Sequence, residues 1–119
     1  MLEKILTRRT EFKNCVLAIT SAPKSLDVIP FVEELVKSRL AACVKVLPAG
    51  ISVFCWKNKF EIEHEQIVVI KTTVSRVREL EKRIQLFHPD EVPEFIVLPI
   101  IDGNADYLKW IEESTASLD

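Results

Sequence analysis

The chain has 119 residues, of which 48% are hydrophobic and 29% charged, and its formal net charge is −2. This length suits a single globular domain, and the composition excludes a largely disordered chain. A net charge so close to zero creates no global field that would attract nucleic acid or an anionic membrane, so we expect neither as a partner. The apolar runs are too short to cross a bilayer, and the 2 glycines form no phosphate loop of the GxGxxG or GxxxxGK[ST] type.

Residues 1–14 differ from the rest of the chain because they are rich in charge and contain no apolar core of signal-peptide length. We interpret them as an N-terminal extension and expect one domain over residues 15–119. The 3 cysteines, Cys15, Cys43 and Cys55, are odd in number and widely spaced, which indicates free thiols in a cytoplasmic protein.

The domain is expected to begin with a strand and a helix. Residues 15–20 are almost all apolar, as is typical of a central strand covered on both faces, and residues 21–25 form a polar turn. Apolar side chains with helical spacing follow at Phe31, Val32, Leu35, Val36 and Leu40. We expect Asp27 to cap this helix, because Pro30 then falls in the first turn, where backbone N–H groups lack helical partners.

A long β-hairpin is expected next. Its strands cover residues 42–56 and 60–72, and Lys57–Asn58–Lys59 makes the tight reversal between them. Pro48–Ala49–Gly50 interrupts the first strand and has the composition of a bulge or bend. The second strand ends in a continuous β-branched run followed by Lys71, a cation that must reach water, a carboxylate or a ligand.

The second half of the domain repeats the pattern of helix and strand. A helix capped by Ser75 and ending before Pro89 has one apolar face, formed by Val77, Leu80, Ile84 and Phe87. A proline-fixed loop over residues 88–94 leads to a buried strand over residues 95–98.

Pro99 ends this strand and implies a sheet edge or terminus at that point. Asn104 then caps a last helix, which carries Tyr107, Leu108 and Ile111. The resulting order is βαββαβ plus a C-terminal helix. It predicts a ferredoxin-like α+β sandwich with both crossover helices on one face of the sheet.

The length of the hairpin bears on the oligomeric state. Residues 60–72, if fully extended, span about 43 Å, whereas a compact domain of this size has a diameter of about 35 Å. The tip, which carries Trp56 and Phe60, therefore overruns its own core. Exposed aromatic residues on free hairpin edges promote aggregation of a monomer, so we expect a closed oligomer in which each hairpin pairs with a neighbour.

His88 is the strongest single candidate for chemistry. It follows a helix in the proline-fixed loop, with Asp90, Glu91 and Glu94 close by in sequence. A histidine beside carboxylates can bind a divalent cation or form a proton-transfer pair. The alternative is a structural role, in which the imidazolium complements the dipole of the helix and caps its last carbonyls.

Two other groups have a functional and a structural interpretation. Glu61, Glu63 and Glu65 point to one face of their strand, either as metal ligands or as solvated charges that protect a sheet edge. Cys43 and Cys55 are either thiolate ligands for a soft metal or buried structural thiols, and no CxxC spacing supports the first interpretation. An RNA-recognition domain shares the βαββαβ order, but the strand over residues 65–71 lacks the aromatic side chains on which bases would stack.

Several segments, in this order, resemble the CutA family of divalent-cation tolerance proteins. They are Arg39–Leu40–Ala41–Ala42–Cys43–Val44, Trp56–Lys57–Asn58–Lys59, Ile70–Lys71–Thr72–Thr73, His88–Pro89, Val92–Pro93–Glu94, Leu98–Pro99–Ile100 and Tyr107–Leu108–Lys109–Trp110. The resemblance extends from about Cys15 to Glu113. This sequence departs from the family pattern at two positions. Asp90 stands where a tyrosine usually follows the His–Pro pair, and Phe54 stands where tyrosine is frequent before the hairpin tip.

The resemblance implies a tight homotrimer with interlocked hairpins, similar to the nitrogen-regulatory signalling proteins. It also implies a cleft between subunits lined by Trp56, Lys71, His88, Glu94 and Tyr107. Members of the family are linked to tolerance of copper and other divalent metals, some bind Cu(II), and no enzymatic reaction is established for them. We therefore expect no enzyme here.

Two hypotheses follow for the cleft. In the first, His88, Glu94 and Asp90 bind Cu(II) or another divalent cation, and the oxygen ligand that Asp90 adds favours a harder or borderline metal. In the second, a signalling or scaffold trimer binds a small anionic metabolite through Lys71, with Trp56 and Tyr107 beside it. If Lys71 instead pairs with Glu94, that carboxylate is less free for a metal. A hydrolase that uses His88 as a base is the least supported, because no nucleophile is evident.

Overall fold

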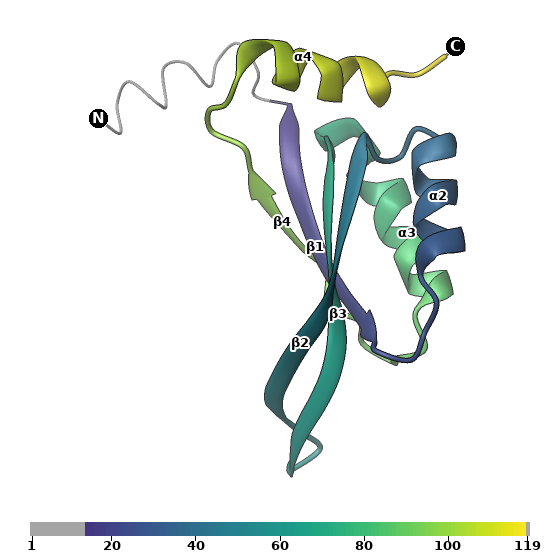
Figure 1. The fold of residues 1–119 in the computed structure, drawn as a ribbon, viewed down its shortest axis with the longest axis vertical. Helices are drawn as coiled ribbons and strands as arrows, with labels where there is room; N and C mark the ends of the chain where they lie inside the picture. The colour runs from purple at the N-terminus through teal and green to yellow at the C-terminus, as the bar shows by residue number, and fades with distance from the viewer. Residues whose placement is uncertain (1–13, 119) are drawn as a thin grey trace.

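The computed structural model describes residues 14–118, which form one antiparallel sheet with helices packed on it (Figure 1). The predicted extension over residues 1–14 lies, apart from Asn14, outside the described residues. In chain order the elements are β1 (Cys15–Pro23), α2 (Ile29–Lys37), β2 (Cys43–Trp56), β3 (Lys59–Thr73), the 3-10 turn η2 (Val74–Arg76), α3 (Val77–Phe87), β4 (Ile96–Pro99) and α4 (Ala105–Ser114).

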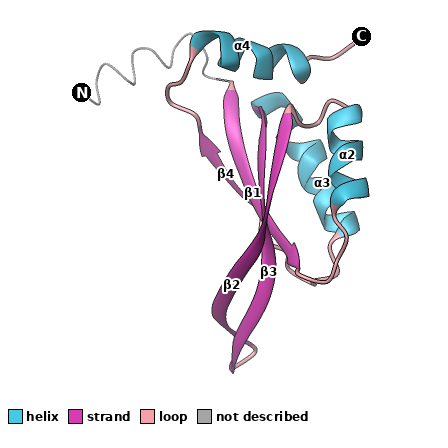
Figure 2. Cartoon of the chain, viewed as in Figure 1, coloured by secondary structure: helices cyan, strands magenta, loops and turns pink. Residues whose placement is uncertain are grey.

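The sheet has the strand order β2-β3-β1-β4, and all of its neighbouring strands are antiparallel. The central strands are β1 and β3, as predicted from the apolar residues 15–19 of β1 and the apolar run Ile67–Ile70 of β3. Helices α2 and α3 pack side by side on one face of the sheet, and α4 lies across the end of the sheet where β1 begins (Figure 2). This is the ferredoxin-like α+β arrangement expected from the sequence.

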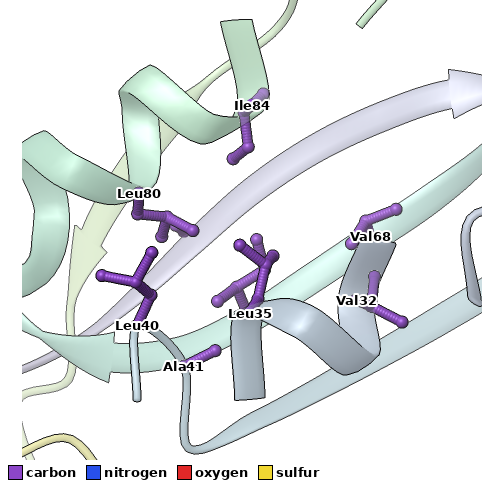
Figure 3. Packing of buried hydrophobic residues seen from close by; sticks show 9 residues of the cluster. Val32, Leu35, Leu40, Ala41, Val68, Leu80 and Ile84 are labelled. Atoms are coloured by element: carbon purple, nitrogen blue, oxygen red, sulfur yellow. The ribbon is translucent and has the colours of Figure 1, made fainter. Parts of the chain in front are cut away.

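The core lies between the sheet and the helix pair α2 and α3. Leu35 from α2 meets Leu80 and Ile84 from α3, and all three side chains are almost completely buried (Figure 3). On the sheet side the layer is completed by Ala18 of β1 and by alternate residues of β3 such as Val68. Burial of one such aliphatic side chain is worth about 1.5–3 kcal/mol, so this layer is the main stabilising feature of the domain.

The hairpin of β2 and β3 projects well beyond this core (Figure 1). The register shifts between Leu47 and Gly50, which confirms the predicted bulge. Glycine suits this position, because a Cβ atom at residue 50 would lie only 3.0 Å from the carbonyl oxygen of Glu65 and the neighbouring strand would have to shift. At the tip Lys57 and Asn58 both adopt left-handed backbone angles, with φ of 51° and 67°. Positive φ at both central residues is the pattern of a type I′ hairpin turn.

Three local predictions were wrong in detail. Residues 21–23 continue β1 instead of turning, because the amide of Gln66 binds the carbonyl oxygens of Pro23 and Leu26 and holds the strand end in place. Ser75 caps no helix, since a 3-10 turn precedes α3 and no side chain caps that turn or the helix. Asp27 does accept a hydrogen bond from the Ile29 N–H, at 3.1 Å, but from one residue before the N-cap position.

The face of the sheet opposite α2 and α3 carries a continuous row of apolar side chains. Alternation along the strands and their register place these side chains on one side, and we call them the open face: Leu17, Ile19, Leu47, Ile67, Ile96 and Leu98. Ile96 is 51% exposed and Leu98 42% exposed. The prediction of a buried strand over residues 95–98 was therefore wrong for the single chain, because β4 is an edge strand and no helix covers this side of it.

Candidate functional site

A cavity of the described chain lies between the projecting hairpin and the loop that precedes β4. Its volume is about 520 Å³, within the range of small-molecule sites. We call it the acidic cleft, and its lining residues are Ser21, Ser52, Val53, Phe54, Trp56, Glu63, Glu65, Asp90, Glu91, Val92 and Glu94. Five of these residues are Asp or Glu, and none is Lys, Arg or His.

Two contacts hold the loop of residues 88–95 over the sheet and so close one side of the acidic cleft. The hydroxyl of Thr20, in β1, donates to the carbonyl oxygen of Glu94 at 2.6 Å. At the mouth, the ammonium of Lys57 lies 3.5 Å from a carboxylate oxygen of Glu91 and 5.7 Å from the centre of the Trp56 ring. The tip of the hairpin and the loop are thus joined through one lysine.

His88 does not line the acidic cleft, although it supports one wall of it. Its side chain is only 2% exposed. The ring atom Nδ1 accepts the Asp90 N–H at 3.0 Å, so Nε2 carries the proton and donates to the carbonyl oxygen of Ser21 at 2.8 Å. A structural role for His88 was one of the two interpretations, but the predicted partner was wrong. The imidazole binds a carbonyl oxygen of β1 and does not cap the last carbonyls of α3.

Lys71 and Tyr107 lie in a different part of the molecule from the acidic cleft. The Lys71 ammonium donates to the Tyr107 hydroxyl at 2.8 Å and lies 5.0 Å from the centre of that ring. The Tyr107 ring stacks on Trp110 with a centroid distance of 5.6 Å. Lys71 is six residues from Glu65 along β3, roughly 20 Å in an extended strand. Within this single chain Lys71 bonds to Tyr107 and no ion pair joins it to Glu94, so the pairing considered for these two residues does not form inside one subunit.

The structure therefore separates the predicted site residues into two groups. Trp56, Asp90 and Glu94 meet in the acidic cleft, with His88 behind its wall, whereas Lys71 and Tyr107 form a separate pair. Within residues 14–118 no group of three or more His, Cys, Asp or Glu side chains is arranged to hold a metal ion. The donor types at Asp90 and Glu94 fit a hard or borderline cation, but one chain alone does not assemble a complete ligand set.

Glu63 and Glu65 are site residues whose role the sequence left open. Their register opposite Ser52 and Gly50 places both along the cleft, where Glu63 is exposed to solvent, as one of the two interpretations expects, and Glu65 is buried. Glu65 lies two residues before the apolar run that starts at Ile67, nearer the centre of the sheet than Glu61 and Glu63, and this position is the signal that it is less exposed than they are. Cys43 and Cys55 are free thiols at opposite ends of β2 and do not form a thiolate pair.

A domain of this architecture, with a projecting hairpin and a carboxylate-lined cleft beside it, is a variant of the ferredoxin-like fold. The family model described as "CutA1 divalent ion tolerance protein" matches residues 16–114. The chain therefore belongs to the CutA1 family of divalent ion tolerance proteins, as its motifs indicated.

Individual relatives agree with this assignment. The divalent-cation tolerance protein CutA of Thermus thermophilus is 40% identical over 81 residues, which cover 68% of this chain and 79% of the relative. CutA of Escherichia coli is 31% identical over 110 residues, and the match covers 92% of this chain and 98% of the relative. The crystal structure of CutA1 from Oryza sativa superposes with a TM-score of 0.82 at 30% identity, covering 88% of this chain and 97% of that one. None of the helices in the described part is long and apolar enough to cross a membrane.

Proposed function

We propose that this protein is a homotrimer that binds Cu(II) or another divalent cation in the acidic cleft, at the boundary between subunits. The observation that carries the proposal is the charge of the cleft, whose lining includes five carboxylates and no cation, with Lys57 paired to one of them, Glu91, at the mouth. Such a cleft has a negative potential that concentrates cations. The names of the relatives, which are divalent-cation tolerance proteins, point to the same class of ligand.

Asp90 and Glu94 would supply oxygen ligands from the loop, and a neighbouring subunit would complete the set. The absence of a full ligand group within residues 14–118 is what a shared site predicts. His88 would be a ligand only through Nδ1, since Nε2 is protonated and bound to β1. A metal would have to displace the Asp90 N–H from Nδ1, and a borderline ion such as Cu(II), which favours imidazole, is the best suited to do so.

The open face and the hairpin support self-association. Leu47, Ile96 and Leu98 are each more than two-fifths exposed in the single chain, and near the tip Phe60 is 74% exposed. An apolar surface of this extent marks an interaction site, and a ring of identical subunits would cover it without leaving a free edge. Sedimentation velocity at micromolar concentration should give the mass of a trimer, and a stable monomer would contradict this part of the proposal.

We place the protein in the cytoplasm and assign it no catalytic reaction. All three thiols are free, as expected in a reducing compartment. The two ring nitrogens of His88 hold backbone groups of β1 and of the loop. A general base would need one of those nitrogens free.

A second ligand class is favoured by one observation at the other group of predicted residues. Within residues 14–118 the Lys71 ammonium contacts only the neutral phenol of Tyr107, and Tyr107 and Trp110 are 39% and 43% exposed. An unneutralised cation beside two accessible rings could hold a small anionic metabolite. Loss of anion binding in Lys71→Ala, with Cu(II) binding intact, would support this alternative.

Calorimetric titration of Cu(II) tests the metal proposal. We expect Asp90→Asn with Glu94→Gln to weaken binding at least tenfold, which corresponds to about 1.4 kcal/mol. His88→Ala should also weaken it. The matched control is Glu34→Gln, which removes one carboxylate from the exposed side of α2 and should leave the affinity unchanged. Equal affinity in the wild type and the double variant would refute the assignment of these carboxylates.

A further inference from the structure

The loop of residues 88–95 is tied to the end of β1 by two buried side chains. At its start the imidazole of His88 donates to the carbonyl oxygen of Ser21 at 2.8 Å, and near its end the hydroxyl of Thr20 donates to the carbonyl oxygen of Glu94 at 2.6 Å. Apart from the ladder between β4 and β1, no backbone-to-backbone hydrogen bond of the described residues involves this loop beyond His88. The position of the loop therefore depends on side-chain contacts.

Thr20 lies at the point where the chain that leads into β4 separates from β1. The pairing of the two strands ends where Ile96 lies opposite Ile19, one residue before Thr20. Thr20 alternates along β1 with Ala18, so its side chain lies on the face of the sheet that packs on α2 and α3, and the residue is only 4% exposed. The hydroxyl thus takes over from the backbone ladder at the first position where the ladder is no longer formed.

Packing alone does not explain a threonine at this position. Its side chain lines a small void together with the apolar side chains of Val68 and Ile84, where a valine of nearly the same shape would fit. A buried hydroxyl is costly unless it forms a hydrogen bond, and its distance of 2.6 Å to the carbonyl oxygen of Glu94 is normal for an O–H···O bond. The polar atom therefore serves the contact with the loop.

The two backbone groups of the loop that are held in this way belong to the two proposed oxygen ligands. Thr20 binds the carbonyl of Glu94, and the imidazole at the start of the loop accepts the N–H of Asp90 at 3.0 Å. Glu91, between them, is tied only by an exposed ion pair with Lys57, which adds little stability. Both partners of each buried contact belong to the same chain, so these contacts need neither a cation nor a second subunit.

We propose that Thr20 is a positioning residue for the proposed metal site, an inference that rests on the metal function. Its hydroxyl holds the backbone of Glu94 so that the Glu94 carboxylate is presented to the acidic cleft before a cation binds. A ligand group that is held in advance loses less conformational freedom on binding. Thr20 does not line the acidic cleft itself, so it acts on a bound cation only through Glu94.

Two substitutions separate the hydroxyl from the shape of the side chain. Thr20→Val removes the hydroxyl and keeps the branched shape, whereas Thr20→Ser keeps the hydroxyl. In the metal-free full chain, Thr20→Val should speed the hydrogen exchange of the Asp90 amide by roughly threefold or more, measured by NMR, because one of the two ties of the loop is lost. Thr20→Ser should exchange at the wild-type rate. Equal rates in the wild type and Thr20→Val would overturn the proposal.

Calorimetric titration of Cu(II) is the second measurement. Thr20→Val should weaken binding by roughly two- to tenfold, the ratio that corresponds to one neutral hydrogen bond, and Thr20→Ser should restore the wild-type affinity. The matched control is Val68→Ala, which weakens the core opposite Thr20 without changing a contact of the loop, and its affinity should equal that of the wild type. If Thr20→Val does not fold, Thr20→Ala takes its place with the same expectations.

The failure of this inference can be distinguished from the failure of the proposed function. Cu(II) binding that is weakened by Glu94→Gln but is equal in the wild type and Thr20→Val overturns the positioning role and leaves the metal function standing. Equal losses of affinity in Thr20→Val and Thr20→Ser, or in Thr20→Val and Val68→Ala, also overturn it, because the loss would then come from general destabilisation. Absence of Cu(II) binding by the wild type overturns both proposals.

Discussion

At the scale of single residues, Cys15 gives a prediction that depends on burial alone. The thiol is fully buried beneath α4, and its sulfur contacts the carbonyl oxygen of Leu108 at 3.6 Å. Burial, with a smaller effect from the negative charge of Glu112, raises the pKa of Cys15 from its ordinary value of 9.0 to about 11. Because the thiolate is the reactive form, we expect alkylation by iodoacetamide at pH 8 to spare Cys15 until the protein is unfolded in guanidinium chloride.

The same raised pKa fixes the sign of a pH effect on stability. The folded state keeps the thiol proton up to a higher pH than the unfolded state does. The contribution of Cys15 is therefore fully present below pH 9.0 and is lost as the pH rises through about 11. In urea titrations, Cys15→Ala should lose stability less steeply than the wild type between these two values. Parallel slopes would contradict this assignment.

The sequence predicted which residues are candidates for the site, but it did not predict which of them lie close together in the structure. The motifs indicated Trp56, His88 and Glu94, and strand alternation put Glu63 and Glu65 on one face. Which of them meet depends on long-range register, such as Glu65 opposite both Pro23 and Gly50. The resemblance placed Tyr107 beside Lys71, but the hydrogen bond between them depends on the docking of α4, which no local pattern predicts.

At the scale of elements, α4 is held by two guanidinium groups at its C-terminal end. Arg39 donates to the carbonyl oxygens of Glu113 and Ala116, and Arg76 donates to that of Thr115 at 2.7 Å. These are the carbonyls that a helix leaves without internal partners. We expect Arg39→Ala to lower the free energy of unfolding by about 1.5–3 kcal/mol, the value of hydrogen bonds to a charged group, measured by urea titration at fixed protein concentration.

Two further variants separate the causes of that loss. Arg39 has a φ of 63°, and glycine adopts this angle without strain, so Arg39→Gly should be less destabilised than Arg39→Ala by about 1 kcal/mol. Arg78→Ala removes an exposed arginine that pairs only with Glu81 on the surface of α3, and it should change stability by less than about 1 kcal/mol. If Arg39→Ala and Arg78→Ala lower the free energy of unfolding equally, the contact of Arg39 with α4 contributes no more to stability than an exposed ion pair does.

Elements whose ends are marked by local chemistry were predicted well, and those whose ends depend on distant contacts were not. Asn104 does cap α4, with its side chain accepting the Tyr107 N–H at 3.0 Å, and Gly50 does mark the bulge. The end of β1 was misplaced because Gln66, on another strand, stabilises residues that look like a turn. A sequence window around residues 21–23 contains no information about that amide.

At the scale of the whole molecule, the sequence predicted the topology and an overlong hairpin, but not that one complete face of the sheet would be left uncovered. Helix periodicity accounts for the layer formed by α2 and α3. The apolar residues on the other side of β1, β3 and β4 read as ordinary core residues, because periodicity alone does not say what covers a strand. In the structure they form the open face, and their apolar character is explained only if another surface packs against them.

A pair of matched substitutions tests whether copies of the chain cover the open face. Ile96, on β4, is 51% exposed, and Leu86, on α3, is 85% exposed, so in a lone chain glutamate would be tolerated at either position. If the open face is buried between subunits, Ile96→Glu places a carboxylate without a partner in an apolar interface. That change should cost more than about 1–3 kcal/mol per subunit and shift the sedimentation profile towards monomer at micromolar concentration. Leu86→Glu lies on the helical side and should keep the wild-type mass. Identical sedimentation of both variants and the wild type as monomers would mean that the open face is not a contact between copies of this chain.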